Sequence, residues 1–461
     1  MTRYHLLLIK GFLLLSGSAL ATDKSDSTHL NSVNDFIRNG HFHGHLRNYF
    51  MATDNSGSLT DYHAYAFGAG IGYKSTQLYG FQIGFSGFFI FNVFSNDLGA
   101  LDPISNARSR YELGNFDLEN PGNHKDMDRL EELYIRYTFH DSHITVGRQN
   151  LKTPFINPQD GRMRPSLEEG FWMELNEIPK LKVQGGWLYA MSPRSTKDWF
   201  SVGESIGVYP VGRGADGLPS GYKGNVESRG VAIGSVQFAP VKALQWEAWQ
   251  YYVENVFALS FTQLETTLPL NEKLTLILGG QLGYQQAVGE GGNANPALRY
   301  IEEGSENYFM SFRAGWKNAR WSSSVNYTKI GDQNRFLMPR EWGVEPFYTF
   351  MPRERMEGSA ASQAFVVKNS FKPDSQWKWS LEYGHFYLPD VQDVARNKYT
   401  MPSYFQLNLS GSYEFSGLFE GFNLQALYVY KGALGNTYGE GRYVMNKVNM
   451  SNYNLIVNYH F

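Results

Sequence analysis

The feature that most constrains the fold of this chain is an alternation of apolar and polar side chains that continues to its final residue. The closing segment YNLIVNYHF is apolar or aromatic at every second position: Tyr453, Leu455, Val457, Tyr459 and Phe461. Polar side chains alternate with these: Asn452, Asn454, Asn458 and His460. Because successive side chains of a strand point to opposite faces, the segment predicts a β-strand with one oily face and one polar face.

The same pattern recurs along the chain, in RLEELYIRYTF (129–139), NYFMSFRAGW (307–316) and WKWSLEYG (377–384) among others. It predicts roughly 18 strands, with bounds uncertain by about 2 to 4 residues. They are expected near residues 42–51, 62–74, 78–93, 129–139, 143–149, 168–177, 181–191, 229–238, 243–254, 256–266, 273–286, 306–317, 320–329, 363–371, 376–387, 404–415, 422–431 and 449–461.

The expected connections alternate between short and long. KSTQ, HDSH, APVK, KNAR and KPDSQ are short, whereas 94–128, 192–228, 287–305 and 330–362 are long. Short turns on one rim and long loops on the other are typical of outer-membrane barrels. The predicted fold class is therefore all-β: a transmembrane antiparallel β-barrel with long extracellular loops.

A barrel suits a bilayer because hydrocarbon offers no partner to backbone amides, and a closed sheet leaves no edge unpaired. Ring closure would also keep the final strand ordered, and an even strand number would place both ends on the periplasmic side. A helical membrane protein is excluded, since no segment after the first twenty or so residues approaches the 18 or so consecutive apolar residues of a spanning helix. The soluble alternative is a secreted propeller or solenoid, but the chain shows no repeat of about 40 to 50 residues.

The N-terminus has the features of an export signal. Arg3 and Lys10 supply positive charge, the stretch from Leu6 to Leu15 is mostly apolar, and Ala19-Leu20-Ala21 is a small-x-small cleavage site. We expect a signal peptide at 1–21, a periplasmic segment at 22–40 and the barrel at 41–461. The formal charge of −3 gives no reason to expect nucleic acid as a partner.

Strand number sets the width of the lumen, and 16 to 18 strands leave an aqueous channel. The default function is therefore permeation of small polar solutes, with selectivity set by whatever narrows the lumen. The segment 148–170 is the candidate, because its prolines forbid a strand while Phe155, Ile156 and Met163 are apolar. We expect it to fold inward; an exposed surface loop is the alternative.

At this segment the sequence resembles the OprD family of outer-membrane porins. GRQNLKTPFINPQDGRM is similar to the inward-folding third loop of that family, and HLRNYFM (45–51) to its first strand. The resemblance implies an 18-stranded channel, often a homotrimer, in the outer membrane of a Gram-negative bacterium. It also implies that small carboxylate-bearing solutes pass a ladder of basic side chains, with outer-membrane lipid around the wall.

The candidate site residues come from this resemblance and from strand parity. The resemblance points to Arg47, Arg148 and Asp160. Parity adds four further lumen candidates for the ladder: Arg136, Arg313, Lys368 and Lys431. The constriction-loop candidates are Pro154, Asn157, Asp160 and Arg162. Strict alternation turns Arg148 outward unless Gly147 forms a bulge, and each basic residue has the alternative of a simple ion pair.

The segment 330–362 departs from the family pattern. It is long and contains Arg335, Arg340, Arg353 and Arg355, so its own contribution to a constriction stays open.

Two other motifs match a catalytic or a metal-binding pattern only in part. The sequence GESIG around Ser205 matches a nucleophile elbow, but the following VYPVGRG does not predict the required helix. His41, His43 and His45 share one face of the first strand and form a candidate metal site, for which interfacial histidines are the alternative. We expect no enzyme activity, no cofactor and no resident metal; an outer-membrane lipase is the enzymatic alternative.

The sequence thus predicts a porin for small polar solutes, and the family resemblance implies that these solutes bear a carboxylate. The alternatives are an adhesin or scaffold that acts through long loops, and a less selective saccharide-permeable porin.

Overall fold

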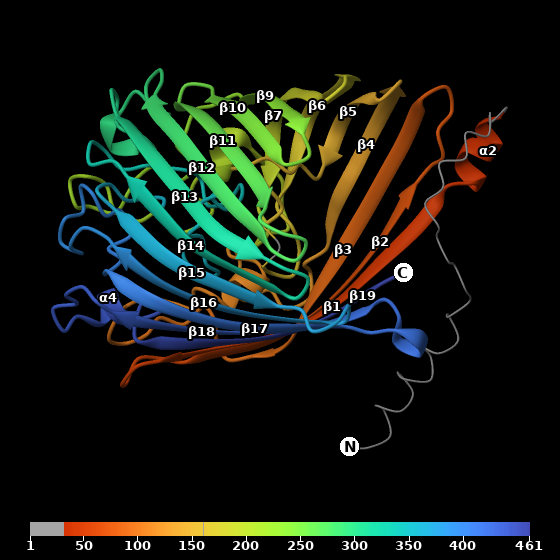
Figure 1. Ribbon diagram of the computed structural model, residues 1–461. Helices are drawn as coiled ribbons and strands as arrows, with labels where there is room; N and C mark the ends of the chain where they lie inside the picture. Colours follow the sequence, from red (N-terminus) through yellow and green to blue (C-terminus); the bar gives the residue numbers. More distant parts are fainter. Residues whose placement is uncertain (1–31, 160) are drawn as a thin grey trace.

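The computed structural model describes residues 32–159 and 161–461. Within these residues, one antiparallel sheet contains 19 strands. One of them, β8 (Phe200–Ser201), is a two-residue strand that pairs with the end of β7 inside a long loop. The other eighteen form the wall of a closed barrel (Figure 1). The all-β barrel predicted from the period of two is confirmed.

The strands match the expected segments closely. The wall consists of β1 (His41–Asn55), β2 (Tyr62–Lys74), β3 (Phe81–Ser95), β4 (Arg129–Phe139), β5 (Ser142–Gln149), β6 (Leu167–Ile178), β7 (Leu181–Ser192), β9 (Val231–Val241), β10 (Leu244–Val253), β11 (Phe257–Pro269), β12 (Thr275–Ala287), β13 (Glu306–Lys317), β14 (Trp321–Ile330), β15 (Gln363–Phe371), β16 (Trp377–Tyr387), β17 (Tyr404–Glu414), β18 (Phe422–Ala433) and β19 (Met450–His460). The short helices are α2 (Val33–Arg38), α3 (Val202–Ser205), α4 (Gly441–Val444), η1 (Leu113–Asn115), η2 (Pro296–Leu298) and η3 (Gly417–Phe419).

The ring closes between the first and last strands. β1 pairs with β2 on one side and with β19 on the other (Figure 1). In the second pairing, Leu46 lies opposite Tyr459. The pairing extends to the last residue, because Gly44 and Phe461 exchange backbone hydrogen bonds of 2.8 and 3.1 Å. The final strand is therefore ordered by pairing with the first, as its alternation predicts.

The two rims differ in their connections. All turns on one rim are short, from 75–80 to 415–421, whereas the opposite rim carries the long loops 96–128, 193–230, 288–305 and 331–362. The predicted alternation has two exceptions, because 56–61 and 254–256 are short turns on the long-loop rim. At the second, Asn255 has a left-handed backbone (φ 63°), which asparagine adopts more readily than most residues.

The two faces of the wall differ as predicted. In β4, Leu133 and Ile135 are 52% and 55% exposed, whereas Tyr134 between them is 5% exposed. In β19, Tyr453 and Leu455 are exposed on the outside. The described part of the chain contains no helix long and apolar enough to cross a membrane.

The long loops fold into the barrel and supply most of its packed interior. Buried loop residues such as Phe155, Phe336 and Trp342 pack with inward-facing wall residues such as Tyr251 and Phe309 in one apolar cluster. The lumen is therefore narrowed by loops.

The expected signal peptide, 1–21, lies outside the described residues, as does most of the expected periplasmic segment. From that segment, α2 lies at the short-turn rim, where Ser32 caps its first turn by accepting a hydrogen bond from the Asp35 backbone. The Thr76 hydroxyl donates to the Phe36 carbonyl, which ties the helix to the turn after β2. The proposed boundaries at 21 and 40 stay predictions.

Candidate functional site

The loop between β5 and β6 reaches across the barrel interior. Phe155 is 1% exposed, and its ring centroid lies 5.8 Å from that of Tyr251, 5.4 Å from Phe261 and 5.9 Å from Phe309. These three partners point inward from β10, β11 and β13, which lie three to six wall strands beyond β6 in the ring. The apolar side chains of this segment thus pack against inward-facing residues of other wall strands, so the loop folds inward as predicted.

The loop between β14 and β15 joins it inside the lumen. The backbone N–H of Asn157 donates to the Trp342 carbonyl at 3.0 Å, and the Asn157 side-chain amide donates to the Val344 carbonyl at 2.9 Å. The side-chain amide of Gln281 in β12 donates to the Pro346 carbonyl at 2.9 Å. Residues 331–362 therefore form the second half of the constriction, a role that the sequence left open.

The tip of this second loop crosses to the seam of the barrel. Arg353 donates from Nε to the Asn452 amide oxygen at 2.8 Å and from Nη2 to the Tyr49 hydroxyl at 2.8 Å. Tyr49 and Asn452 belong to β1 and β19. The loop thus spans the lumen from the β14–β15 side to the β1–β19 side.

Three guanidinium groups gather where the loops meet. A side chain added at Gly161 would place its β-carbon 3.1 Å from Nη1 of Arg194 and 4.0 Å from Nη1 of Arg353. Arg162 follows directly and is 6% exposed. Burial, together with the charges of Arg353 and Arg194, lowers the pKa of the Arg162 guanidinium to about 9. We call Arg162, Arg194 and Arg353 the arginine cluster.

The arginine cluster is held by neutral partners. Arg194 donates to the Gln159 carbonyl at 2.9 Å, and Arg162 donates to the Gly161 carbonyl at 2.7 Å. The Nε atoms of Arg162 and Arg194 are buried without a hydrogen-bond partner. Among the described residues, no carboxylate lies within ion-pair distance of the three guanidinium groups, although Glu112 is near enough for the charge of Arg162 to act on its carboxyl group.

Of these three arginines, only Arg162 was among the candidates. Arg194 lies in the β7–β9 loop and Arg353 in the β14–β15 loop, and no motif spacing relates them to 148–170. Their positions depend on how three loops pack, which the period of two does not encode. The concentration of arginine in 330–362 was the one available signal.

The ladder candidates on the wall lie on the inner face, except Arg148. Arg47 is 5% exposed, and its guanidinium carbon lies 5.8 Å from the Tyr49 ring centroid. Arg136 donates from Nε to the hydroxyl of the buried Thr145 at 3.0 Å. These placements agree with strand parity.

Three ladder candidates have acidic neighbours. Arg313 forms an ion pair with Glu265 at 2.6 Å, and the Lys368 ammonium lies 3.9 Å from a carboxylate oxygen of Glu382. Lys431 has no exposed side-chain surface; its ammonium donates to the Tyr111 hydroxyl at 2.7 Å and lies 3.4 Å from Glu354. Lys431 thus anchors loop 96–128 to the wall.

Arg148 lies on the outer face, which corrects its assignment to the lumen. It is opposite the exposed Leu133 in an unbroken β4–β5 register. Gly147 has a left-handed backbone (φ 115°) but produces no register shift there. Arg148 forms an ion pair with Glu169 at 3.0 Å, and its guanidinium carbon lies 4.5 Å from the Trp199 ring centroid. Simple alternation predicted this orientation, and the motif resemblance did not.

The constriction-loop candidates have mixed outcomes. Asn157 connects the two loops, and Arg162 belongs to the arginine cluster. Pro154 is half-buried, and its carbonyl accepts a hydrogen bond of 3.1 Å from the Asn157 amide. Asp160 lies outside the described residues.

The motifs set aside on sequence show no chemistry here. Ser205 is fully buried; its hydroxyl donates to the Val202 carbonyl and accepts from the Trp342 indole at 2.8 Å. Ser205 ends a short helix, α3, and the segment VYPVGRG that follows forms no helix, as expected. Across residues 32–159 and 161–461, no three His, Cys, Asp or Glu side chains come together as a potential metal site, and this includes His41, His43 and His45.

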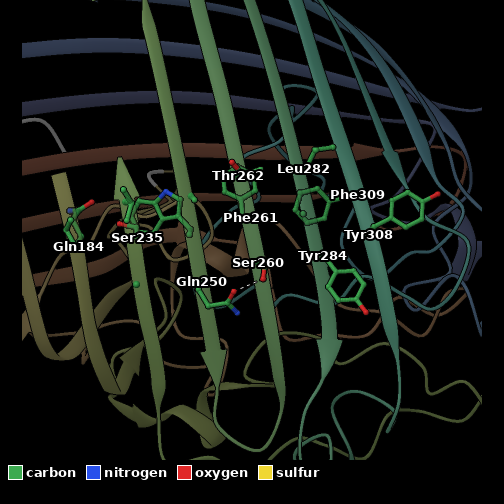
Figure 2. A pocket seen from close by; sticks show the side chains of 16 residues that line it. Gln184, Ser235, Gln250, Ser260, Phe261, Thr262, Leu282, Tyr284, Tyr308 and Phe309 are labelled. Atoms are coloured by element: carbon green, nitrogen blue, oxygen red, sulfur yellow. Dashed lines mark hydrogen bonds between the residues drawn. The ribbon is translucent and has the colours of Figure 1, made fainter. Parts of the chain in front are cut away.

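A hollow of about 800 Å³ lies outside the channel, over β7 and β9–β13 (Figure 2). Its exposed lining residues include Ser260, Leu282 and Tyr284; in β11 Ser260 is followed by the buried, inward-facing Phe261, and in β12 Leu282 and Tyr284 flank the buried Gly283. It therefore opens on the outer face of the wall. The Ser260 hydroxyl donates to the Gln250 amide oxygen at 2.5 Å within it. This hollow is not part of the permeation path.

Comparison with protein families agrees with the barrel and its inward loops. The family model described as "outer membrane porin, OprD family" matches residues 34–384, most of the chain. The chain belongs to the OprD family of outer-membrane porins. It is therefore an outer-membrane channel of a Gram-negative bacterium, with the long-loop rim extracellular and the short-turn rim periplasmic.

Solved structures share the fold of this porin at low sequence identity. OpdK of Pseudomonas aeruginosa, crystallised with vanillate, is 16% identical with a TM-score of 0.71, and the alignment covers 92% of this chain and 99% of OpdK. OccK9 (OpdG) of the same organism is 14% identical with a TM-score of 0.72, at 92% and 99% coverage. OccAB4 of Acinetobacter baumannii is 15% identical with a TM-score of 0.70, at 92% and 98% coverage. The comparison with curated proteins finds no match.

Proposed function

We propose that this porin passes small polar solutes bearing a carboxylate, and that the arginine cluster selects them. The observation that carries the proposal is the gathering of Arg162, Arg194 and Arg353 at the crossing of the two constriction loops, with no carboxylate of the described residues within ion-pair distance. A solute that enters the constriction meets this positive field in a narrow space.

Electrostatics supports this role. Two unit charges 4 Å apart attract by about 1 kcal/mol in water and by about 4 kcal/mol at an effective dielectric constant of 20. Three guanidinium groups with neutral partners therefore attract an anion more strongly than basic side chains do whose charge is balanced by a neighbouring carboxylate. Arg313 and Lys368 have Glu265 and Glu382 beside them, so these sites add a weaker attraction along the wall.

Weak binding also suits permeation, since a solute must leave as readily as it enters. A planar carboxylate matches the fork geometry of guanidinium groups. The vanillate named with OpdK is a carboxylate of this kind, which supports the proposed solute class for the present porin.

Reversal potentials in a planar bilayer under a KCl gradient test the proposal. Replacing Arg162 and Arg194 together by glutamine should lower the chloride-to-potassium permeability ratio at least about twofold, because two cations leave the constriction. Arg148→Gln is the matched control, since this arginine lies on the outer face. Liposome swelling with benzoate and with a neutral sugar of similar size extends the test to solutes.

An unchanged reversal potential in the double variant, or equal benzoate and sugar rates in the wild type, would favour the less selective saccharide porin instead. Absence of any conductance would favour a scaffold or adhesin. A homotrimer stays a prediction, to be checked by the mass of the detergent-solubilised protein.

A further inference from the structure

The tip of the β14–β15 loop carries Arg353 in a backbone conformation that arginine rarely adopts. Its φ is 84°, in the left-handed region that few residues other than glycine occupy. Such a conformation persists only where the surrounding structure holds it. Arg353 belongs to the arginine cluster, so the contacts that hold this tip also fix the position of one of the three cluster charges.

The next residue, Glu354, is buried among three cations. Its Oε1 atom lies 2.9 Å from Nη2 of Arg110 and 3.6 Å from Nη1 of Arg340, and its Oε2 atom lies 3.4 Å from Nζ of Lys431. The backbone N–H of Arg355 also donates to Oε1, at 3.3 Å. Burial opposes the charge of Glu354, but the three cations outweigh burial and lower the pKa of its carboxyl group well below the usual range. Glu354 is therefore ionised at neutral pH.

The three cations come from different parts of the porin. Lys431 projects from the wall strand β18, Arg110 belongs to the β3–β4 loop, and Arg340 lies in the β14–β15 loop itself. Arg340 has Glu357 as a second partner. In the described part of the chain, no carboxylate other than that of Glu354 lies within ion-pair distance of Lys431 or Arg110. Glu354 thus connects the loop tip to the wall and to a neighbouring loop.

Arg353 and Glu354 hold the tip on two sides. The Arg353 guanidinium reaches the Tyr49 hydroxyl in β1 at 2.8 Å, whereas the Glu354 carboxylate reaches β18 and the β3–β4 loop. The main chain is held by Gln406 in β17, whose side-chain amide donates to the Pro352 carbonyl at 2.7 Å. Of these contacts, only those of Glu354 join opposite charges, and a buried charge that loses its partner strongly destabilises the structure around it. The position of the tip therefore depends most on Glu354.

We propose that Glu354 is a positioning residue for the selectivity of the channel: by binding Lys431, Arg110 and Arg340, it holds Arg353 in its left-handed conformation and keeps the Arg353 guanidinium in the arginine cluster. The effect of Glu354 on selectivity rests on the function proposed above for that cluster.

The sign of the effect separates positioning from a direct effect of charge. A carboxylate beside the constriction repels anions, so its removal should by itself raise the anion preference. In Glu354→Gln, however, the three cations lose their shared partner and repel one another. The tip then moves, the backbone of Arg353 relaxes, and its guanidinium leaves the cluster. Positioning therefore predicts that the anion preference falls although a negative charge has been removed.

Reversal potentials of the whole porin under a KCl gradient test this role in Glu354→Gln, Arg353→Gln and the variant with both changes. Glu354→Gln should lower the chloride-to-potassium permeability ratio at least about twofold. The variant with both changes should match Arg353→Gln, because the position of the tip no longer matters once the guanidinium is absent. Glu174→Gln is the matched control: Glu174 lies beside the buried Gln184 on the inner face of β6 and pairs with Lys182 at 2.8 Å, so its removal should not lower the ratio.

Two results would overturn the positioning role alone: a ratio in Glu354→Gln that is unchanged or higher while Arg353→Gln lowers it, or effects of the two changes that simply add. An unchanged ratio in Arg353→Gln would instead contradict the selective role of Arg353 in the arginine cluster, and the role of Glu354 with it.

If Glu354→Gln does not fold, as judged by loss of the heat-dependent shift in electrophoretic migration, Glu354→Asp replaces it. Aspartate keeps the charge but withdraws the carboxylate by one methylene group, so a change in the permeability ratio reports position and not charge. The ratio should fall in Glu354→Asp and should not fall further when Arg353→Gln is also present. A ratio equal to that of the wild type would contradict the proposal.

Discussion

Phe155 should hold the constriction loop in place, and replacing it by alanine tests this directly. The side chain is 1% exposed and contacts the rings of Tyr251, Phe261, Phe309 and Phe336. Truncating a buried phenylalanine typically costs about 3 to 5 kcal/mol, which includes the cavity left behind. That cost falls on the docking of the loop, because the wall strands keep their own backbone pairing.

A loss of this size changes the ratio of docked to undocked loop by about 100- to 4,000-fold, since each 1.4 kcal/mol is a factor of ten. Trypsin measures the undocked fraction, because the bond between Arg162 and Met163 joins residues that are only 6% and 1% exposed. Phe155→Ala should be cleaved there much faster than the wild type, and its single-channel conductance should rise.

Phe171→Ala is the matched control, because the same ring is removed from a side chain that is 40% exposed on the outer face. It should leave cleavage after Arg162 and the conductance unchanged. If Phe155→Ala shows wild-type cleavage and conductance, then the hydrogen bonds of Asn157 to the second loop hold the constriction, and the reasoning from aromatic packing is wrong.

Two further predictions concern the wall. Arg136→Ala should lower the anion preference by less than about twofold, because Arg136 lies on the wall and not at the loop crossing. This effect is smaller than the one expected for the arginine cluster. A larger shift in reversal potential would place the selective step at Arg136. Gly147→Ala should destabilise the barrel by about 1 to 3 kcal/mol, because its φ of 115° is left-handed and an added β-carbon would lie 2.2 Å from the Leu133 carbonyl oxygen. A lower temperature for the electrophoretic mobility shift measures this loss, and an unchanged temperature contradicts it.

The wall could be predicted from the sequence almost residue by residue. The bounds of β2, β4, β13 and β15 agree with the expected segments. One face of each strand contacts lipid and the other faces a polar interior. Apolar and polar residues therefore alternate along the strand, and this period of two can be recognised in the sequence. The same parity also placed Arg136 and Arg313 on the inner face.

The arginine cluster could not be predicted in the same way. Arg194 and Arg353 are brought to Arg162 by loops whose conformation depends on contacts such as those of Asn157 and Tyr49. Arg148 shows the reverse case, in which local alternation gave the correct face and a motif match gave the wrong one. Periodicity thus describes a regular wall well, whereas the irregular segments inside it depend on long-range packing.

The seam between β1 and β19 sets the order in which such a ring can assemble. His45 and Asn458, which form a hydrogen bond across it, are 413 positions apart in the chain. Bringing such distant segments together costs more entropy than forming any hairpin, so this junction gains its stability only after the intervening hairpins are aligned. A register error between any two strands would misalign the backbone hydrogen-bonding groups of β1 and β19. A mutation far from the seam could therefore destabilise the barrel at the seam.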